Sequence, residues 1–167
     1  DVARPGGDTL RLDNGQHILI GAYRHTLALM QSVGVEPADV LHAMPLSLRD
    51  PQGAGLALPP WPAPFDAAWG MLTARGWSWG ERFSLLRAAG AWRRAGFRCA
   101  PHLTVAALCA GLAPRVVREL VEPLCVSALN TPMARASGRV FLRVLRDTLA
   151  GPGWGRWGAS WLLLPRA

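Results

Sequence analysis

The hydrophobic and polar positions divide the chain into a front part with short strand-like runs and a longer helical part. Residues 18–20 are an apolar run behind an Asn-Gly turn, a pattern typical of a short buried strand. Thr9–Asp13 alternates, so it is predicted to pair with His17–Gly21 as a hairpin around that turn. Apolar residues then recur at helical spacing, which predicts a first helix over Ala22–Val33.

The segment after this helix predicts a connector and a second hairpin. Val35–Met44 has no clear periodicity, although Pro37 can open a short helical turn within it. Leu46–Asp50 and Gly55–Leu58 alternate on either side of a Pro-Gln-Gly turn, which predicts a hairpin. Residues 59–64 are rich in proline, which cannot donate to a strand ladder, so they are predicted to form a stiff linker.

From Phe65 onward the spacing is helical. One apolar face runs from Phe65 to Leu72 and is predicted to end near Gly76. Ser78 followed by Glu81 predicts a capping box, and the helix it begins is expected to end at Gly96.

Several shorter helices are expected beyond Gly96. Thr104 is predicted to cap a short helix ending near Leu112, and Pro114 to open the next. Pro123 must kink or restart that helix because proline lacks the backbone N–H.

The last predicted helix has the clearest amphipathic pattern in the chain. Thr131 is expected to cap it, with Pro132 in its first turn. Its predicted apolar stripe and opposite arginine face comprise Ser137, Val140, Phe141, Val144, Leu145 and Thr148, and Arg135, Arg139, Arg143 and Arg146. A glycine-rich loop over 151–158 and an apolar run over Trp161–Ala167 follow.

Together these elements predict an α+β fold that is mostly helical, with small antiparallel hairpins. No strand–helix–strand series supports a complete Rossmann fold. We expect residues 1–58 to form a hairpin and helix part and residues 65–150 a helical part.

Composition narrows the class of protein only partly. At 167 residues, half of them hydrophobic, the chain is expected to form one domain, and its net charge of +7 comes entirely from arginine. Cys99, Cys109 and Cys125 lack zinc or disulfide spacing, so we expect buried free thiols in a reducing compartment. The arginines are spread out, which argues against nucleic acid. The chain lacks an initiator methionine, and we expect it to be an internal fragment of a longer protein.

The sequence offers few candidates for chemistry. No GxGxxG follows a strand, and the glycines of residues 151–158 are spaced differently. The histidines at 17, 25, 42 and 102 do not converge as metal ligands, so no metal site is expected. No nucleophile elbow or tuned carboxylate pair is present, and the catalytic residues remain unassigned.

Three segments nevertheless carry a resemblance to a known family. DNGQHILIGAYRHTL at Asp13–Leu27, EPLCVSALNTPMARAS at Glu122–Ser137 and VFLRVLRDTL at Val140–Leu149 resemble the squalene-associated FAD-dependent desaturases. These enzymes, also called hydroxysqualene dehydroxylases, belong to the phytoene desaturase and flavin amine oxidase superfamily. The resemblance extends over most of the chain.

The resemblance implies the substrate-binding segment of a bacterial flavoprotein, an oxidoreductase that uses FAD. It would act on a long isoprenoid, converting hydroxysqualene to squalene for hopanoid biosynthesis, with the main FAD fingerprint outside this chain. The protein would be cytoplasmic and peripheral to the inner face of the membrane. Residues placed near the flavin are Asp13, Asn14, Gly15, Gln16 and His17, and those placed in the substrate pocket are Tyr23, Asn130, Thr131 and Pro132.

The helix that begins at Ser78 carries aromatic and arginine residues on its second arc. Trp79, Arg82, Phe83 and Leu86 are predicted to face a membrane, where aromatics insert and arginine reaches phosphate. The alternative, equally weighted, is that this arc packs under another domain. Residues 130–132 could likewise form a simple helix stop and restart. Alternative functions are a non-catalytic lipid- or membrane-binding module and a soluble interaction domain.

Overall fold

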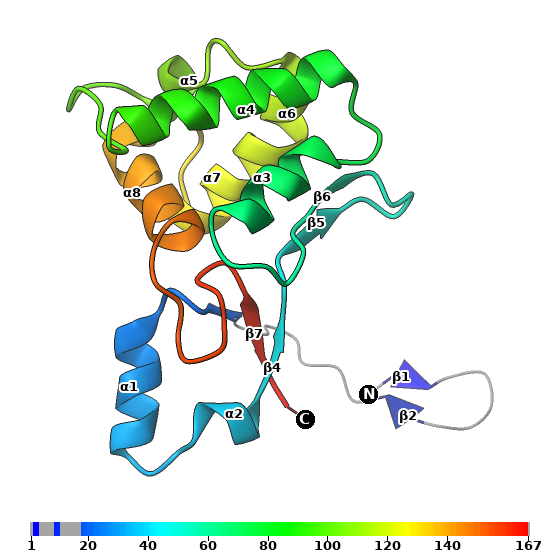
Figure 1. The fold of residues 1–167 in the computed structure, drawn as a ribbon, viewed down its shortest axis with the longest axis vertical. Coiled ribbons are helices and arrows are strands. Elements are labelled where there is room, and N and C mark those ends of the chain that lie inside the picture. The colour runs from blue at the N-terminus through cyan, green and yellow to red at the C-terminus, as the bar shows by residue number, and fades with distance from the viewer. Residues whose placement is uncertain (1, 4–8, 11–17, 167) are drawn as a thin grey trace.

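The computed structural model describes residues 2–3, 9–10 and 18–166. Helices account for 46% of the chain and strands for 14%, and the sheets are small, antiparallel and open. The predicted α+β class is therefore confirmed. Figure 1 shows α3 to α8 gathered in one part of the molecule, with α1, α2 and a three-stranded sheet in the other.

The three-stranded sheet joins segments from both ends of the described chain. β3 (Leu19–Ile20) and β4 (Leu41–Met44) lie on either side of β7 (Leu162–Pro165), and both pair with it antiparallel. Leu163 stands opposite Leu19 on one side and Ala43 on the other, and its side chain is fully buried.

The prediction that Thr9–Asp13 pairs with His17–Gly21 as a hairpin is wrong. β2 (Thr9–Leu10) pairs with β1 (Val2–Ala3), and β3 pairs with β7 instead. The apolar β7 strand gives β3 a buried partner, and burial of apolar surface outweighs a local turn preference. The Asn-Gly turn itself lies outside the described residues.

The other front elements largely follow the sequence prediction. α1 (Arg24–Ser32) lies within the predicted range, and α2 (Pro37–Val40) begins at the expected proline. β5 (Ser47–Arg49) and β6 (Gly55–Ala57) form the predicted second hairpin. β4, by contrast, lies in the segment predicted to be only a connector.

The two helices between residues 65 and 96 begin where predicted, although α3 ends before the expected stop near Gly76. α3 is Phe65–Leu72 and α4 is Trp79–Arg94. The capping box is present, because the Glu81 backbone N–H donates to Ser78 Oγ at 3.3 Å and the Ser78 N–H donates to the Glu81 carboxylate at 2.6 Å. Gly96 follows α4 with a φ of 61°, a conformation that glycine adopts easily.

The helix around Pro123 contains a wider turn instead of a clean break. α6 (Pro114–Val116) continues into the π-helical turn η1 (Val117–Val121) and then into α7 (Glu122–Leu129). Pro123 cannot donate to the carbonyl one turn earlier, and its ring crowds that carbonyl, so a wider turn just before it relieves both problems. α5 (Val105–Leu108) is shorter than predicted but is capped by Thr104 as expected.

The last helix, α8 (Gly138–Leu149), begins later than predicted. Thr131 does not cap it, because the Thr131 hydroxyl donates to the Leu129 carbonyl at 2.8 Å. Residues 131–136 instead form turns tied to α5, where the Val105 N–H donates to the Ala136 carbonyl at 2.9 Å.

The buried face of α8 also differs from the predicted stripe. Phe141, Leu142 and Leu145 are buried, whereas Val140 is 50% exposed. The Gly138 N–H donates to the Leu103 carbonyl at 2.8 Å, and this contact sets which face of α8 turns inward. Leu142 therefore takes the core position that the periodicity had placed at Val140.

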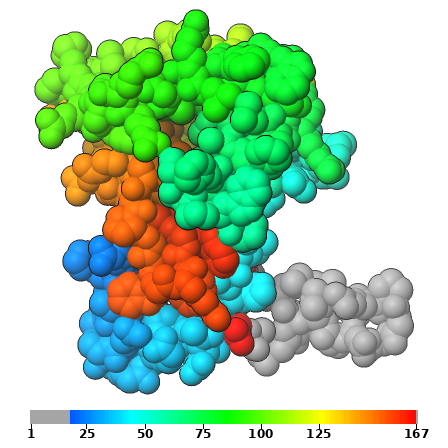
Figure 2. Space-filling model, viewed as in Figure 1, coloured from blue at the N-terminus to red at the C-terminus, as the bar shows by residue number. Residues whose placement is uncertain are grey.

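Two separate hydrophobic clusters hold the fold together. The larger lies among α3 to α8 and includes Leu56 and Leu58 from the β5–β6 hairpin. The smaller consists of Leu27, Leu41, Trp157 and Leu163. The packing thus does not follow a division at residues 58 and 65: the hairpin belongs with the helices, and residues 151–165 return to the front part (Figure 2).

Candidate binding cavity

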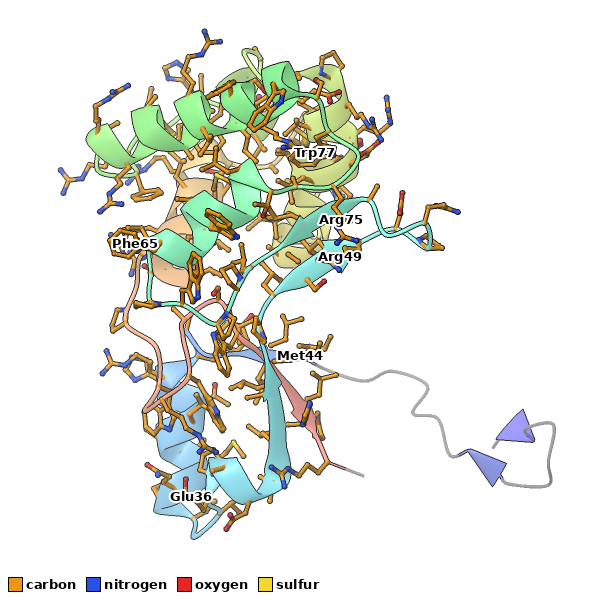
Figure 3. The ribbon with its side chains drawn as sticks, turned by 45° about the vertical axis from the view of Figure 1, so that its right-hand side comes forward. Glu36, Met44, Arg49, Phe65, Arg75 and Trp77 are labelled. Carbon is orange, nitrogen blue, oxygen red and sulfur yellow. The ribbon has the colours of Figure 1, made fainter. Side chains whose placement is uncertain are left out.

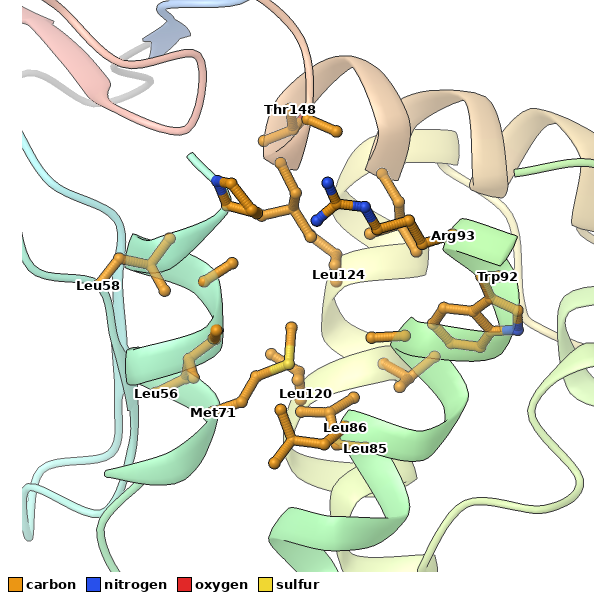
Figure 4. A pocket seen from close by; sticks show the side chains of 18 of the residues that line it. Leu56, Leu58, Met71, Leu85, Leu86, Trp92, Arg93, Leu120, Leu124 and Thr148 are labelled. Carbon is orange, nitrogen blue, oxygen red and sulfur yellow. The ribbon is translucent and has the colours of Figure 1, made fainter. Parts of the chain in front are cut away.

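The described residues enclose a partly open, apolar cavity of about 280 Å³. It lies between the β5–β6 hairpin, α3, α4, η1 with α7, and α8 (Figure 4). Its wall includes Leu46, Leu48, Leu56, Leu58, Pro64, Ala67, Ala68, Met71, Leu85, Leu86, Ala89, Gly90, Phe97, Leu120, Val121, Leu124, Phe141, Val144, Leu145, Leu149 and Ala150.

The side chains that line the cavity differ in size from one wall to another. Leu56 and Leu58 enter from the hairpin side, and Met71 enters from α3 (Figure 4). On α4, however, Ala89 and Gly90 present almost no side chain to the same space. Protein interiors normally fill such gaps with side chains, so an apolar void of this size suits an apolar guest.

Polar side chains are confined to a few positions of the wall. Trp92, Arg93 and Thr148 are the lining residues with side chains able to form hydrogen bonds. Arg93 is exposed on α4, and Thr148 is partly buried on α8 (Figure 4). A ligand would therefore meet hydrocarbon along most of its length and a small polar region at the Arg93 side.

A charged cluster fixes the loop between α3 and α4 against η1. Arg115 Nε donates to Glu119 at 2.7 Å, and the indole N–H of Trp77 donates to the other oxygen at 3.0 Å. Arg115 also donates to the Gly76 carbonyl at 2.6 Å. These hydrogen bonds, the one from Arg115 foremost, hold the pKa of Glu119 below its usual value of 4.5. Trp77 itself is buried in the loop that joins α3 to α4 (Figure 3).

The cysteines are free thiols, as predicted. Cys109 and Cys125 are buried, whereas Cys99 is half-buried. Burial raises the pKa of Cys109 to about 12 and also raises the pKa of Cys125, which keeps both as neutral thiols. The two buried cysteines therefore provide no activated thiolate.

The structure does not gather the predicted pocket residues around this cavity. Tyr23 is 48% exposed just before α1, and Asn130 is exposed with a φ of 47° at the end of α7. Thr131 and Pro132 lie in the turn that follows, and none of these four residues lines the cavity. Asp13, Asn14, Gly15, Gln16 and His17 lie outside the described residues.

The predicted membrane-facing residues separate into two groups. Trp79 and Phe83 are 63% and 57% exposed, with ring centroids 6.1 Å apart. Arg82 lies 4.8 Å from the Trp79 ring centroid and donates to the Leu72 carbonyl at 2.9 Å. Leu86 differs from this pair, because its side chain is partly buried and lines the cavity (Figure 4).

Within residues 2–3, 9–10 and 18–166, no cluster of three or more candidate ligands could bind a metal ion. The glycine-rich loop 151–158 is tightly packed. A side chain at Gly153 would collide with the Trp157 carbonyl, and one at Gly21 with the Gly158 carbonyl. The loop thus packs on itself and against the residue that follows β3.

Sequence reasoning missed this cavity, although one pattern pointed toward it. Leu46, Leu48, Leu56 and Leu58 alternate along both strands of the hairpin, so one face of it is entirely leucine. A two-stranded ribbon with such a face needs a partner surface. The gap in that partner surface depends on how α3, α4 and α8 meet, which no local pattern encodes.

No protein-family model and no curated protein matches this chain. None of the described helices has the length and apolar character needed to cross a bilayer.

Proposed function

We propose that this chain is the substrate-binding segment of an FAD-dependent oxidoreductase that acts on a long-chain isoprenoid. The observation that carries the proposal is the apolar cavity between the β5–β6 hairpin, α3, α4 and α8. The resemblance of Asp13–Leu27, Glu122–Ser137 and Val140–Leu149 to hydroxysqualene dehydroxylases supplies the reaction, hydroxysqualene to squalene in hopanoid biosynthesis.

The size and polarity of the cavity suit part of an isoprenoid with one polar group. Its volume of about 280 Å³ is near the lower end of the roughly 300–1,000 Å³ usual for ligand pockets. It would enclose one portion of a long chain, with the remainder extending through the opening. A hydroxyl group on the isoprenoid would find hydrogen-bonding partners at Arg93 or Thr148.

The proposed reaction replaces a C–OH bond with a C–H bond, consumes two electrons and two protons, and releases water. Flavin would supply the electrons when bound, and this chain would supply an apolar, water-excluding environment. The described residues identify no catalytic acid or base, so we assign none. Residues that would contact FAD are proposed to be Asp13–His17, with the main fingerprint outside this chain.

The same proposal places the molecule at a membrane surface, from which an isoprenoid would enter. Trp79 and Phe83, exposed beside each other on α4, have the amphipathic or apolar character of interfacial anchors. Flotation with neutral phosphatidylcholine vesicles tests this point. We expect Trp79→Ala with Phe83→Ala to reduce flotation, and unchanged flotation would contradict the proposed role of this face.

Two alanines on α4 provide a matched test of the cavity. Ala89 lines the cavity. Ala91, two residues further along the same helix, is exposed and does not line the cavity. Ala89→Phe should fill the cavity and lower the affinity for tritiated hydroxysqualene or squalene about tenfold or more. Ala91→Phe makes the same chemical change outside the cavity and should leave affinity within about twofold. Equal affinities of the two variants would refute binding in the cavity.

The alternative function is a lipid- or membrane-binding module without catalysis, which the exposed Trp79 and Phe83 also favour. Flavin content separates the two functions. The enzyme proposal expects flavin absorbance in the natural protein that carries this sequence, and squalene formation from hydroxysqualene when a reductant is added. Isoprenoid binding without flavin or turnover would support the module and exclude the enzyme.

A further inference from the structure

A second concave feature, lined by arginine, lies next to the cavity. It is a groove of about 490 Å³ between α8 and the segment that follows α4. Phe97 lines both the groove and the cavity, so the two adjoin. The described residues that line the groove are Gly96, Phe97, Arg98, Cys99, Arg139, Arg143 and Arg146.

The groove carries a concentrated positive charge. No acidic residue is among its described lining residues. Asp147 neutralises part of the charge from outside, through contacts of 2.9 Å from Arg143 Nε and 2.8 Å from Arg146. Arg98 and Arg139 make no ion pair within the described part of the chain.

Placing arginines together on one helix face costs stability in the absence of an anion. Arg139 and Arg143 are four residues apart on α8, and Arg143 and Arg146 are three apart, so both pairs are neighbours on the helix surface. Like charges at these spacings destabilise a helix. A bound anion would remove this repulsion, and guanidinium groups match phosphate through paired hydrogen bonds.

The fourth arginine is supplied by a backbone held in an unusual conformation. Gly96 and Phe97 have φ values of 61° and 55°, which turn the chain back from α4 toward α8. The Phe97 N–H donates to the Trp92 carbonyl at 2.8 Å, which fixes this turn. A non-glycine residue in the left-handed region is disfavoured and is retained where surrounding contacts hold it. This turn brings Arg98 to the groove that the arginines of α8 also line.

We propose that this groove binds the phosphate group of an anionic phospholipid at a membrane surface. A lipid head group is favoured over a free phosphate because the groove adjoins an apolar cavity through Phe97. A molecule docked by the groove would thus hold the cavity against the bilayer. The site is separate from the cavity, and its test uses phospholipid without isoprenoid, so that either proposal can fail without the other.

The experiment compares two double variants of equal charge in vesicle co-sedimentation. Arg98→Gln with Arg139→Gln alters the groove, whereas Arg24→Gln with Arg49→Gln alters exposed arginines on α1 and β5 (Figure 3 labels Arg49). Each lowers the net charge of +7 by two. With vesicles of phosphatidylglycerol and phosphatidylcholine, we expect the groove variant to lose about tenfold or more in affinity and the control variant less than about threefold.

Cys99 offers a second readout inside the groove. It is half-buried, whereas Cys109 and Cys125 are buried, so alkylation of the folded protein should modify Cys99 first. Anionic vesicles should slow that alkylation, and pure phosphatidylcholine vesicles should slow it less. This protection is expected to disappear in the Arg98→Gln, Arg139→Gln variant.

Three results would overturn the proposal. Equal losses of affinity in the two double variants would show attraction by net charge alone. Unchanged alkylation of Cys99 on anionic vesicles would show that the groove is not covered. Protection of Cys99 by inorganic phosphate, with no preference for anionic over neutral vesicles, would assign the groove to a free phosphate instead of a lipid.

Discussion

Ser78 stabilises the start of α4 through two reciprocal hydrogen bonds with Glu81. We expect Ser78→Ala to reduce the free energy of unfolding by about 1 kcal/mol, because the Glu81 N–H loses its partner. Urea denaturation measures this loss. Ser127→Ala is a matched control, since Ser127 is exposed on α7 and bonds only to the Leu124 carbonyl of its own helix. A similar loss in both variants would contradict a specific cap.

Glu119 makes stability depend on acid pH. Its folded-state pKa lies below the ordinary value of 4.5, chiefly through the hydrogen bond from Arg115 and then that from Trp77. The unfolded chain therefore takes up the proton first as pH falls. The stabilisation is complete above about pH 4.5 and is lost as pH falls through the folded value.

Replacement of Glu119 tests this dependence. We expect the free energy of unfolding of the native chain to fall more steeply below about pH 4.5 than that of Glu119→Gln. Some slope should remain in the variant, because hydrogen bonds from Ser78 lower the pKa of Glu81 as well. Urea titrations at a series of pH values provide the comparison, and parallel curves would rule out a role for Glu119.

At the scale of elements, α8 shows how a tertiary contact selects one face of an amphipathic helix. Leu142 is fully buried and Val140 is 50% exposed. We expect Leu142→Ala to destabilise the fold by about 2–5 kcal/mol and Val140→Ala by less than about 1 kcal/mol. Denaturant unfolding of both variants measures this. The opposite ranking would restore the stripe predicted from periodicity.

The elements that the sequence predicts correctly are those specified by nearby residues. The α4 capping box needs only Ser78 and Glu81, and the β5–β6 hairpin needs only two alternating runs around a turn. The start of α8 and the partner of β3 depend on distant contacts, with Leu103 and with β7 respectively. No local pattern contains that information, so both predictions were wrong.

The candidate site could be predicted even less completely than the fold. The exposed aromatic pair Trp79 and Phe83 was found from the helical wheel, because exposure on one helix follows periodicity. The cavity arises where Leu56, Ala89 and Thr148 meet from three separate elements. The helical wheel grouped Leu86 with the membrane-facing residues and gave no sign that it lines this cavity.

At the scale of the whole molecule, one buried hydrogen bond joins the helical part to the segment that returns to the front part. The Ser160 hydroxyl donates to Asp66 at 3.1 Å, and both residues are buried. We expect Ser160→Ala to cost about 1–3 kcal/mol, because one carboxylate oxygen of Asp66 loses its partner away from water. Calorimetry or denaturant unfolding provides the measurement.

Ser32→Ala serves as the control for this prediction, since the Ser32 hydroxyl is exposed and bonds to the Leu29 carbonyl. It should change the free energy of unfolding by no more than about 0.5 kcal/mol. Hydrogen exchange adds a test of where the effect occurs. Ser160→Ala should lower the protection of backbone amides in residues 151–165 and α3 more than in α5. A uniform loss of protection would contradict a local role for the hydrogen bond between Ser160 and Asp66.

The central position of β7 has a consequence for how the protein is made. Strands β3 and β4 are synthesised before the strand that separates them, which is translated only with residues 162–165. The helices between residues 65 and 149 contact one another locally and can assemble while synthesis continues. Until β7 emerges from the ribosome, β3 and β4 each have an edge without its native partner.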